Sequence, residues 1–336
     1  MEINKWGQEL LRRGFRQGAS DLYIFPTFSG YDLTFRYHQE KKLHQHVSQN
    51  AAEKLILYYK YLADMDVAEK RRVQVGAGQI KFGEVTRRLR FSTVGNFQNR
   101  ESLVIRFLHD LSQAGHYNLF IPKQLTKLQQ EIQRPGLFLF AGPTGSGKTT
   151  TMYHLAKSAA QENKQVITVE DPVELYAEEF LQLQLNHKIG LDYETLVKVC
   201  LRHRPDILIV GEIRDQQTAQ AVIRGALTGH TIYSTIHGLN KESIIPRLLE
   251  LGVEREELRQ CLQGIIYQRL FPFKCAFCSG SCQVYCSYKE SGVIFDTIFY
   301  THEKEKTSAI SSSWSKSLQQ VWAAGYLKQS DLEKAY

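Results

Sequence analysis

Residues 142–150 read Gly142-Pro-Thr-Gly-Ser-Gly-Lys-Thr-Thr150, directly after the apolar run Gly136-Leu-Phe-Leu-Phe-Ala141. A short apolar run of this kind is typical of a buried strand, and residues 150–160 that follow have a helical pattern. The stretch matches G-x-x-x-x-G-K-[ST], a glycine-rich turn between a strand and a helix that cradles nucleotide phosphates. The sequence therefore predicts a P-loop within an α/β domain.

The residues of this loop supply the groups that a nucleoside triphosphate needs. Glycines let the backbone turn tightly, so that its N–H groups point at phosphate oxygens, and the helix N-terminus adds a favourable dipole. Lys148 is expected to contact the β- and γ-phosphates, and the Thr149 hydroxyl to ligate Mg²⁺. A turn that only capped a helix would not need the lysine, so we predict that ATP and Mg²⁺ bind here. The predicted nucleotide-binding residues are Gly142, Pro143, Thr144, Gly145, Ser146, Gly147, Lys148, Thr149 and Thr150.

Apolar runs like residues 136–141 recur at Gln165–Val169, Asp206–Val210 and Thr231–Ser234, with helical stretches between them. Strands that alternate with helices form a parallel sheet with right-handed crossovers. In such sheets ligands bind outside the carboxyl ends of the strands. Side chains that follow these runs are therefore expected beside the P-loop.

Two of these strands end in carboxylates. The stretch Val166-Ile-Thr-Val-Glu-Asp-Pro-Val-Glu174 closes with three acidic side chains, and Ile207-Leu-Ile-Val-Gly-Glu212 closes with one. Phosphoryl transfer to water needs a group that orients the water and an acid near Mg²⁺. Either carboxylate alone could be a solvated loop residue, but together with the P-loop they predict an active site for ATP hydrolysis.

Three stretches together resemble one family, the secretion and type IV pilus assembly ATPases. Residues 167–174 (ITVEDPVE), 207–215 (ILIVGEIRD) and 229–237 (GHTIYSTIH) are similar to its Asp box, Walker B and His box, in the family's order and spacing. Shorter signatures extend the resemblance over about residues 18–280. They are Ala19–Pro26, Arg90–Thr93, Arg100–Arg106 and Gln268–Leu270.

The resemblance implies an α/β protein with a RecA-like P-loop domain built on a parallel sheet. A smaller α+β, PAS-like domain would precede it, in accord with the mixed helix and strand patterns of residues 1–110. We expect a linker over residues 111–122, the ATPase domain over residues 123–273 and a small C-terminal module over residues 274–336.

The resemblance also implies roles for residues outside the P-loop. Glu174 would be the catalytic glutamate, and Glu212 would be the Walker B acid, a second ligand of Mg²⁺. His230 and His237 would sense the nucleotide near the γ-phosphate or couple it to movement. We prefer this role to metal binding for the two histidines.

Arginines of the N-terminal domain are implied to act on the nucleotide as well. Arg90 and Arg106 would reach its phosphates, because an arginine supplied by another domain stabilises transition-state charge and couples hydrolysis to movement. Further family arginines match Arg202, Arg214 and Arg269. The chain departs from the family pattern at Lys198, where arginine is usual, at Arg100 in place of glycine and at Tyr23 in place of histidine.

Four cysteines follow the expected ATPase domain with the spacing C-x₂-C-x₃-C-x₃-C: Cys275, Cys278, Cys282 and Cys286. Four thiolates can hold Zn²⁺, yet a zinc ribbon separates its two pairs by a dozen or more residues. An iron–sulfur run differs in its second gap and carries a following proline. Structural zinc, reduced free thiols and an iron–sulfur cluster stay open, ranked in that order.

The composition is that of a soluble globular protein, with 336 residues and a net charge of +7. No apolar run approaches the roughly 18 residues that span a bilayer, and the N-terminus has no signal-peptide pattern. We therefore expect a cytoplasmic protein that lies at the cytoplasmic face of the membrane through partners. The sequence has no basic stretch interleaved with aromatic residues, so we do not expect direct binding of nucleic acid.

The family resemblance implies a homo-oligomer, a hexamer, that acts with a polytopic inner-membrane platform protein. We expect an ATP-hydrolysing motor that powers assembly of a pseudopilus. The chain lacks the extra N-terminal domain of many members, and this short form is similar to members that serve competence, the uptake of DNA. The alternatives are a nucleotide-dependent scaffold with negligible turnover, a pilus retraction motor and a DNA translocase.

Overall fold

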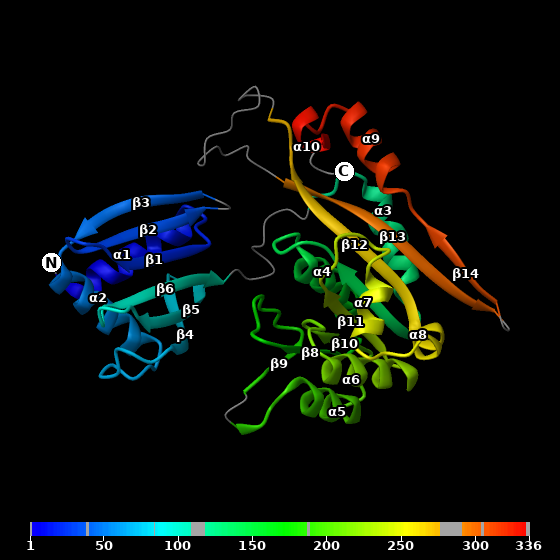
Figure 1. The fold of residues 1–336 in the computed structure, drawn as a ribbon, viewed down its shortest axis with the longest axis horizontal. Coiled ribbons are helices and arrows are strands. Elements are labelled where there is room, and N and C mark those ends of the chain that lie inside the picture. The colour runs from blue at the N-terminus through cyan, green and yellow to red at the C-terminus, as the bar shows by residue number, and fades with distance from the viewer. Residues whose placement is uncertain are drawn as a thin grey trace. The chain divides into compact units, whose positions relative to one another are not determined.

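The computed structural model describes residues 2–37, 40–83, 85–108, 118–186, 189–275, 291–303 and 306–333. The described residues divide into two compact units, one within residues 1–110 and the other within residues 111–336 (Figure 1). Each unit has its own sheet and its own hydrophobic core. None of the described helices combines the length and apolar character that crossing a bilayer requires.

The first unit is an antiparallel sheet with two helices. The sheet has six strands in the order β3-β2-β1-β6-β5-β4. Neighbouring strands all run antiparallel. The elements are α1 (Ile3–Arg16), β1 (Asp21–Pro26), β2 (Tyr31–Tyr37), β3 (Glu40–Val47), α2 (Gln49–Leu62), β4 (Gln74–Phe82), β5 (Val85–Gly95) and β6 (Glu101–Leu108).

The alternation of apolar residues along these strands places both helices on one face of the sheet. In β2 and β6 every second residue is buried, which is the period of a sheet with one covered face. The core joins Leu10 and Leu11 of α1 and Ile56 of α2 to strand residues such as Leu22 and Phe91. The other face of the sheet carries Arg90 and Arg106, which pair across β5 and β6.

The second unit contains the parallel sheet that the sequence predicts. Its helices and strands are α3 (Pro122–Glu131), β7 (Gly136–Ala141), α4 (Lys148–Gln161), β8 (Val166–Glu170), β9 (Leu181–Gln184), α5 (Tyr193–Arg202), β10 (Ile207–Val210), α6 (Gln216–Leu227), β11 (Thr231–Ile236), α7 (Ile244–Glu250), α8 (Arg255–Cys261), β12 (Leu262–Pro272), β13 (Ser291–Glu303), β14 (Lys306–Ser311), α9 (Trp314–Ala323) and α10 (Gln329–Glu333).

Helices cover both faces of this sheet, whose strand order is β14-β13-β12-β7-β11-β10-β8-β9. Leu137 and Leu139 of β7 face a core shared with α5, α6 and α8, whereas Phe138 and Phe140 face a core shared with α3 and α4. Because neighbours along a strand point to opposite faces, a strand covered on both sides must be apolar throughout. This confirms the predicted α/β fold with a parallel sheet.

The sheet continues beyond the residues that the sequence analysis assigned to the ATPase domain. β13 pairs with β12 antiparallel, and β14 pairs with β13. Residues 291–303 and 306–311, which we expected in the C-terminal module, therefore extend the same sheet (Figure 1). The small α9 and α10 pack with Phe120 and Ile294 in a further core.

Candidate active site

The predicted P-loop joins β7 to α4 as a tight turn. Gly142, Gly145 and Gly147 have φ angles of 143°, 78° and 83°, a region that L side chains rarely adopt. At Gly142 a Cβ atom would also lie 2.3 Å from the backbone oxygen of Gln268 on β12. The glycines are thus required by the backbone, and the turn aims the N-terminus of α4 at the end of the sheet.

Lys148 is the first residue of α4 and lies over the loop that precedes it. Its Nζ donates hydrogen bonds to the carbonyl oxygens of Gly142, at 2.9 Å, and Pro143, at 3.0 Å. Burial lowers the pKa of Lys148, and the carboxylates of Glu212 and Glu174 oppose that shift. The side chain is therefore a cation placed between the P-loop and two acids.

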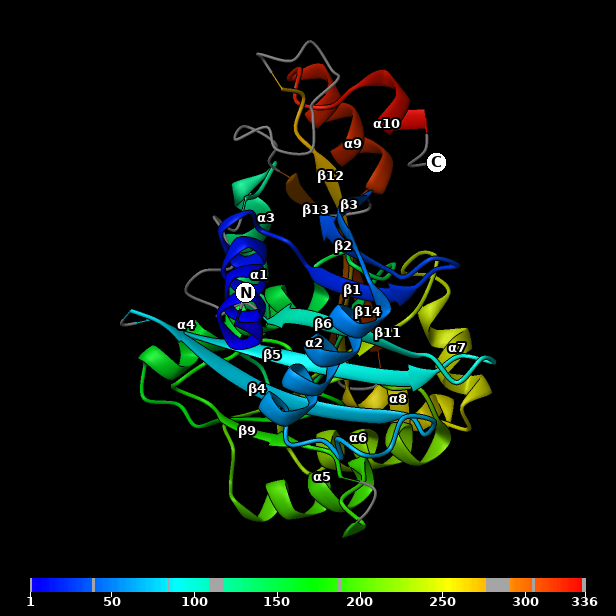
Figure 2. The same ribbon diagram turned by 90° about the vertical axis from the view of Figure 1, so that its left-hand side faces the viewer.

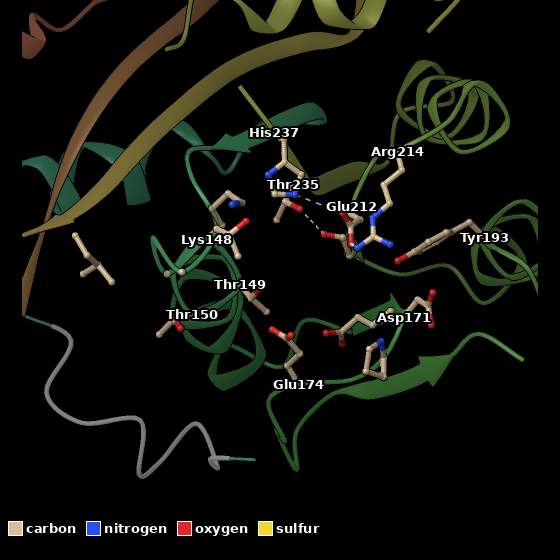
Figure 3. Close-up of a pocket in the computed structure, with 17 residues that line it drawn as sticks. Lys148, Thr149, Thr150, Asp171, Glu174, Tyr193, Glu212, Arg214, Thr235 and His237 are labelled. Atoms are coloured by element: carbon tan, nitrogen blue, oxygen red, sulfur yellow. Dashed lines mark hydrogen bonds and ion pairs between the residues drawn. The ribbon is translucent and has the colours of Figure 1, made fainter. Parts of the chain in front are cut away.

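A cavity of about 530 Å³ opens beside the P-loop, where the strands of the parallel sheet end. Glu174 follows β8, Glu212 follows β10 and His237 follows β11, and all three line it. Figure 3 shows Lys148 and Thr149 on the P-loop side of the cavity and Glu174 across from them. The structure thus brings together the residues predicted at the strand ends, as the parallel topology requires.

Glu212 is more enclosed than the exposed Glu174, with 16% of its side chain exposed. Its Oε1 pairs with the Arg214 guanidinium, and its Oε2 lies 3.6 Å from His237 Nε2. Oε2 is buried and has no hydrogen-bond partner. A buried carboxylate oxygen without a hydrogen bond is costly, and a cation would satisfy it.

The residues around the cavity fit Mg²⁺ and ATP. The P-loop offers backbone N–H groups and Lys148 to phosphate oxygens, and Thr149 and Glu212 offer the oxygen ligands that Mg²⁺ prefers. The volume lies within the range of ordinary ligand sites, about 300–1,000 Å³.

The other predicted metal site, the cysteine cluster, falls largely outside the described residues. Of its four cysteines, Cys275 is described and is buried, while Cys278, Cys282 and Cys286 lie outside the described residues.

His230 does not line this cavity, although we expected it near the γ-phosphate. It precedes β11, whose first residue Thr231 pairs with Gly136 at the start of β7. His237 follows the same strand at its other end. A strand of six residues spans roughly 20 Å, so the two histidines lie at opposite ends of β11, roughly that distance apart. Arg90 and Arg106 belong to the N-terminal unit.

Four residues of the site were not identified as functional from the sequence. Glu170 and Tyr193 line the cavity, and Thr235 donates from Oγ1 to the Gly211 oxygen at 2.7 Å. Gln268 is fully buried and donates from Nε2 to the Ser146 oxygen of the P-loop at 2.7 Å. Glu170, Thr235 and Gln268 lie within the family stretches quoted above, so position in a motif was their available signal.

Tyr193 had no such signal. It begins α5, which starts there because the Asp192 side chain accepts a hydrogen bond from the Thr195 N–H at 2.8 Å. This cap turns the chain so that Tyr193 faces the strand ends (Figure 3). Burial and nearby carboxylates raise the pKa of Tyr193, so the phenol is a neutral hydrogen-bonding group at neutral pH.

Comparison with known proteins gives a consistent result. The profile of the family described as Type II/IV secretion system protein matches residues 2–321. Competence protein ComGA of Streptococcus pneumoniae is 45% identical over 269 residues, which cover 80% of this chain and 84% of that protein. Type IV pilus assembly ATPase TfpB of Acinetobacter baylyi is 37% identical, covering 80% of this chain and 46% of that protein.

Solved structures share the fold. The ATPase DotB of Legionella pneumophila superposes with a TM-score of 0.75 at 17% sequence identity, covering 98% of this chain and 94% of that one. The two-unit arrangement along the chain, an antiparallel sheet followed by a P-loop unit, is therefore a known fold.

Proposed function

The chain belongs to the type II/IV secretion system protein family and is a P-loop ATPase, and from that premise we propose that it is the motor that powers assembly of a pseudopilus used in DNA uptake. The similarity to competence protein ComGA supports the competence role. The similarity to a type IV pilus assembly ATPase supports work on a filament. We further propose that it acts as a hexamer at the cytoplasmic face of the membrane, with a polytopic platform protein.

One observation supports hydrolysis above all: the placement of Lys148 between the P-loop and two strand-end carboxylates around one cavity. A scaffold that only bound nucleotide would need the P-loop but not Glu174 facing it. An exposed carboxylate at this position can orient a water molecule toward the γ-phosphate. The residues present therefore favour a motor over the scaffold.

Each group has a distinct task in this proposal. Bound Mg²⁺ neutralises charge on the phosphates of ATP. Lys148 and the P-loop N–H groups bind the phosphates, and Thr149 and Glu212 hold the cation. Glu174 orients the attacking water and accepts its proton. Arg214 and His237, which contact both oxygens of Glu212, keep that carboxylate in place.

ATPase assays on two variants test the proposal. Lys148→Ala should abolish nucleotide binding and turnover, because the loop loses its only cation. Glu174→Gln should bind nucleotide normally and lower kcat by about 10²–10⁴-fold, the usual contribution of a general base. Glu178→Gln serves as a matched control, because this exposed acid lies on the same segment and does not line the cavity. Full hydrolysis by both Lys148→Ala and Glu174→Gln would refute the motor.

The competence role needs a separate measurement. Replacement of the chromosomal gene with the Glu174→Gln variant should abolish DNA uptake and the surface pseudopilus together. Uptake at the normal level, with the filament intact, would contradict the assignment to competence while leaving the ATPase unaffected.

A further inference from the structure

Two phenylalanines stand out on the N-terminal unit. Phe28 and Phe97 are the most exposed large apolar side chains among the described residues, and both are almost fully accessible to solvent. Phe28 lies in the turn between β1 and β2, and Phe97 lies in the turn between β5 and β6. A single exposed apolar residue is ordinary. Two exposed phenylalanines at the tips of adjacent turns indicate a binding surface.

The two turns lie side by side at one end of the sheet. β1 and β6 are antiparallel neighbours, with Ile24 opposite Leu103, so the end of β1 meets the start of β6. Figure 2 shows the β1–β2 and β5–β6 turns at this same end. Arg100 ties them together, because its guanidinium donates to the carbonyl oxygens of Thr27 and Gly30.

Both tips are held in fixed turns. The Thr27 N–H donates to the Gly30 oxygen at 2.9 Å, which closes the turn around Phe28. In the other turn Asn96 Oδ1 accepts hydrogen bonds from the N–H groups of Gln98, at 3.0 Å, and Arg100, at 2.9 Å. The phenyl rings are therefore presented by ordered backbone, which lowers the entropy lost on binding.

A basic loop borders the second tip. The backbone of Lys70 and Arg71 lies against Gly95, where a Cβ atom would be 2.8 Å from the Lys70 oxygen. Lys70–Val73 are all exposed. The loop's own acid, Glu69, accepts from the Arg71 N–H at 2.7 Å and lies 3.7 Å from Arg72. That carboxylate offsets part of the charge at Arg72, so the three consecutive cations Lys70, Arg71 and Arg72 leave the exposed loop with a net positive charge.

We propose that this edge, defined by Phe28, Phe97 and the loop Lys70–Val73, docks on an anionic lipid bilayer. Aromatic side chains on separate, protruding tips can enter the headgroup region, and neighbouring cations can meet lipid phosphates. A protein partner would need a continuous complementary surface, whereas these tips project singly. β6 ends at Leu108, and the length of this strand places its last residue roughly 23 Å from the two turns, at the other end of the sheet.

The proposal deepens the proposed function by assigning the surface that meets the membrane, and it rests on that function for the membrane location alone.

Sedimentation of the full chain with lipid vesicles tests the proposed docking surface. The chain should bind vesicles of phosphatidylcholine mixed with phosphatidylglycerol and not vesicles of phosphatidylcholine alone. Phe28→Ser with Phe97→Ser should weaken binding by about tenfold or more, since two buried rings are lost. Arg71→Gln with Arg72→Gln should weaken it about fivefold for each charge at low salt.

Matched controls separate this surface from general effects. Leu43→Ser replaces another exposed apolar residue, 62% accessible and on β3, and Lys5→Gln with Arg12→Gln removes two charges from α1. These variants should bind like the parent chain, and all variants should keep their ATPase activity. Equal binding by the phenylalanine variant, or no binding of the parent chain to either vesicle, would overturn lipid docking without touching the motor. In the second case, loss of DNA uptake in the phenylalanine variant would point to a protein partner instead.

Discussion

Glu170 shows how one residue can belong to the active site without facing the nucleotide directly. It ends β8, is 3% exposed, and accepts hydrogen bonds from the Tyr153 hydroxyl and from Thr168 Oγ1, the latter at 2.6 Å. Burial raises its pKa to about 7, although both hydrogen bonds lower it. Gln182 donates to the Tyr153 hydroxyl at 2.8 Å and to the Leu175 oxygen at 2.7 Å. The network thus anchors the segment that carries Glu174.

The raised pKa of Glu170 predicts a pH-dependent loss of stability. Between about pH 4.5 and pH 7 the unfolded chain releases this proton while the folded chain keeps it, so the free energy of unfolding falls as pH rises. The loss should total at most about 3 kcal/mol and level off above pH 7. Glu170→Gln, which keeps an oxygen acceptor, should lack this slope. Urea unfolding of both proteins at pH 5 and pH 8 measures the difference.

The control for this measurement is Glu178→Gln, which removes an exposed carboxylate eight residues away that does not contribute to the pKa shift of Glu170. It should leave the slope between pH 5 and pH 8 as in the parent chain. If parent and Glu170→Gln lose stability equally over this range, Glu170 does not titrate as its burial implies.

At the residue scale, the sequence predicted those site residues that a motif places at the end of a strand. Lys148, Glu174 and Glu212 meet around one cavity because they follow parallel strands. The role of His230, which came from the resemblance to the His box, stays a prediction, since this residue precedes β11 and does not line the cavity. The hydrogen bond from Tyr153 to Glu170 could not be predicted, because Tyr153 lies on α4, outside the acidic stretch.

At the scale of elements, β12 supports the P-loop from beside β7. It pairs with β7 in parallel, with Tyr267 opposite Ala141, so Gln268 arrives next to the loop. Its amide donates to the Ser146 oxygen at 2.7 Å, and its backbone oxygen occupies the space that a side chain at Gly142 would take. The Gln-Arg-Leu signature therefore acts through strand pairing as well as through its side chains.

Gln268→Leu should weaken the P-loop while keeping the volume of the core. The Ser146 oxygen loses its donor in a buried site, which should cost about 1–3 kcal/mol of unfolding free energy and raise the Kd for ATP. Isothermal titration with ATP and urea unfolding measure the two effects. Gln263→Leu, on the same strand but away from the loop, should leave the affinity unchanged. Unaltered affinity in both variants would exclude a supporting role for Gln268.

In the P-loop unit, the sequence predicted four strands, each from an apolar run. The runs at β7, β8 and β10 are buried along their whole length, and β11 is buried after its first residue. β9 is partly exposed, and β14 carries serine and threonine, so neither gives an apolar run. In the N-terminal unit the alternation of β4, β5 and β6 was enough to predict strands, because one face of that sheet is covered.

At the scale of the whole molecule, the chain carries its nucleotide site on one unit and a row of charged residues on the other. On the N-terminal sheet Arg36, Asp21, Arg106 and Arg90 lie opposite one another across β2, β1, β6 and β5. Arg106 Nε lies 3.0 Å from Asp21 Oδ1, and Asp21 is buried. Replacing Arg106 would remove this ion pair from the buried Asp21 carboxylate, so we test the row at Arg90 instead.

Arg90→Ala should therefore separate catalysis from folding and from nucleotide binding. If this arginine stabilises transition-state charge, as its match to the family implies, kcat should fall on the order of 10³-fold, while the Kd for ADP changes little. Arg88→Ala is the matched control, because Arg88 lies two residues away on the same strand and the same face, and its kcat should stay near that of the parent chain. Single-turnover hydrolysis is the decisive measurement, since it isolates the chemical step from product release. Equal single-turnover rates for Arg90→Ala and Arg88→Ala would mean that Arg90 does not stabilise transition-state charge, against the role that the family match implies for it.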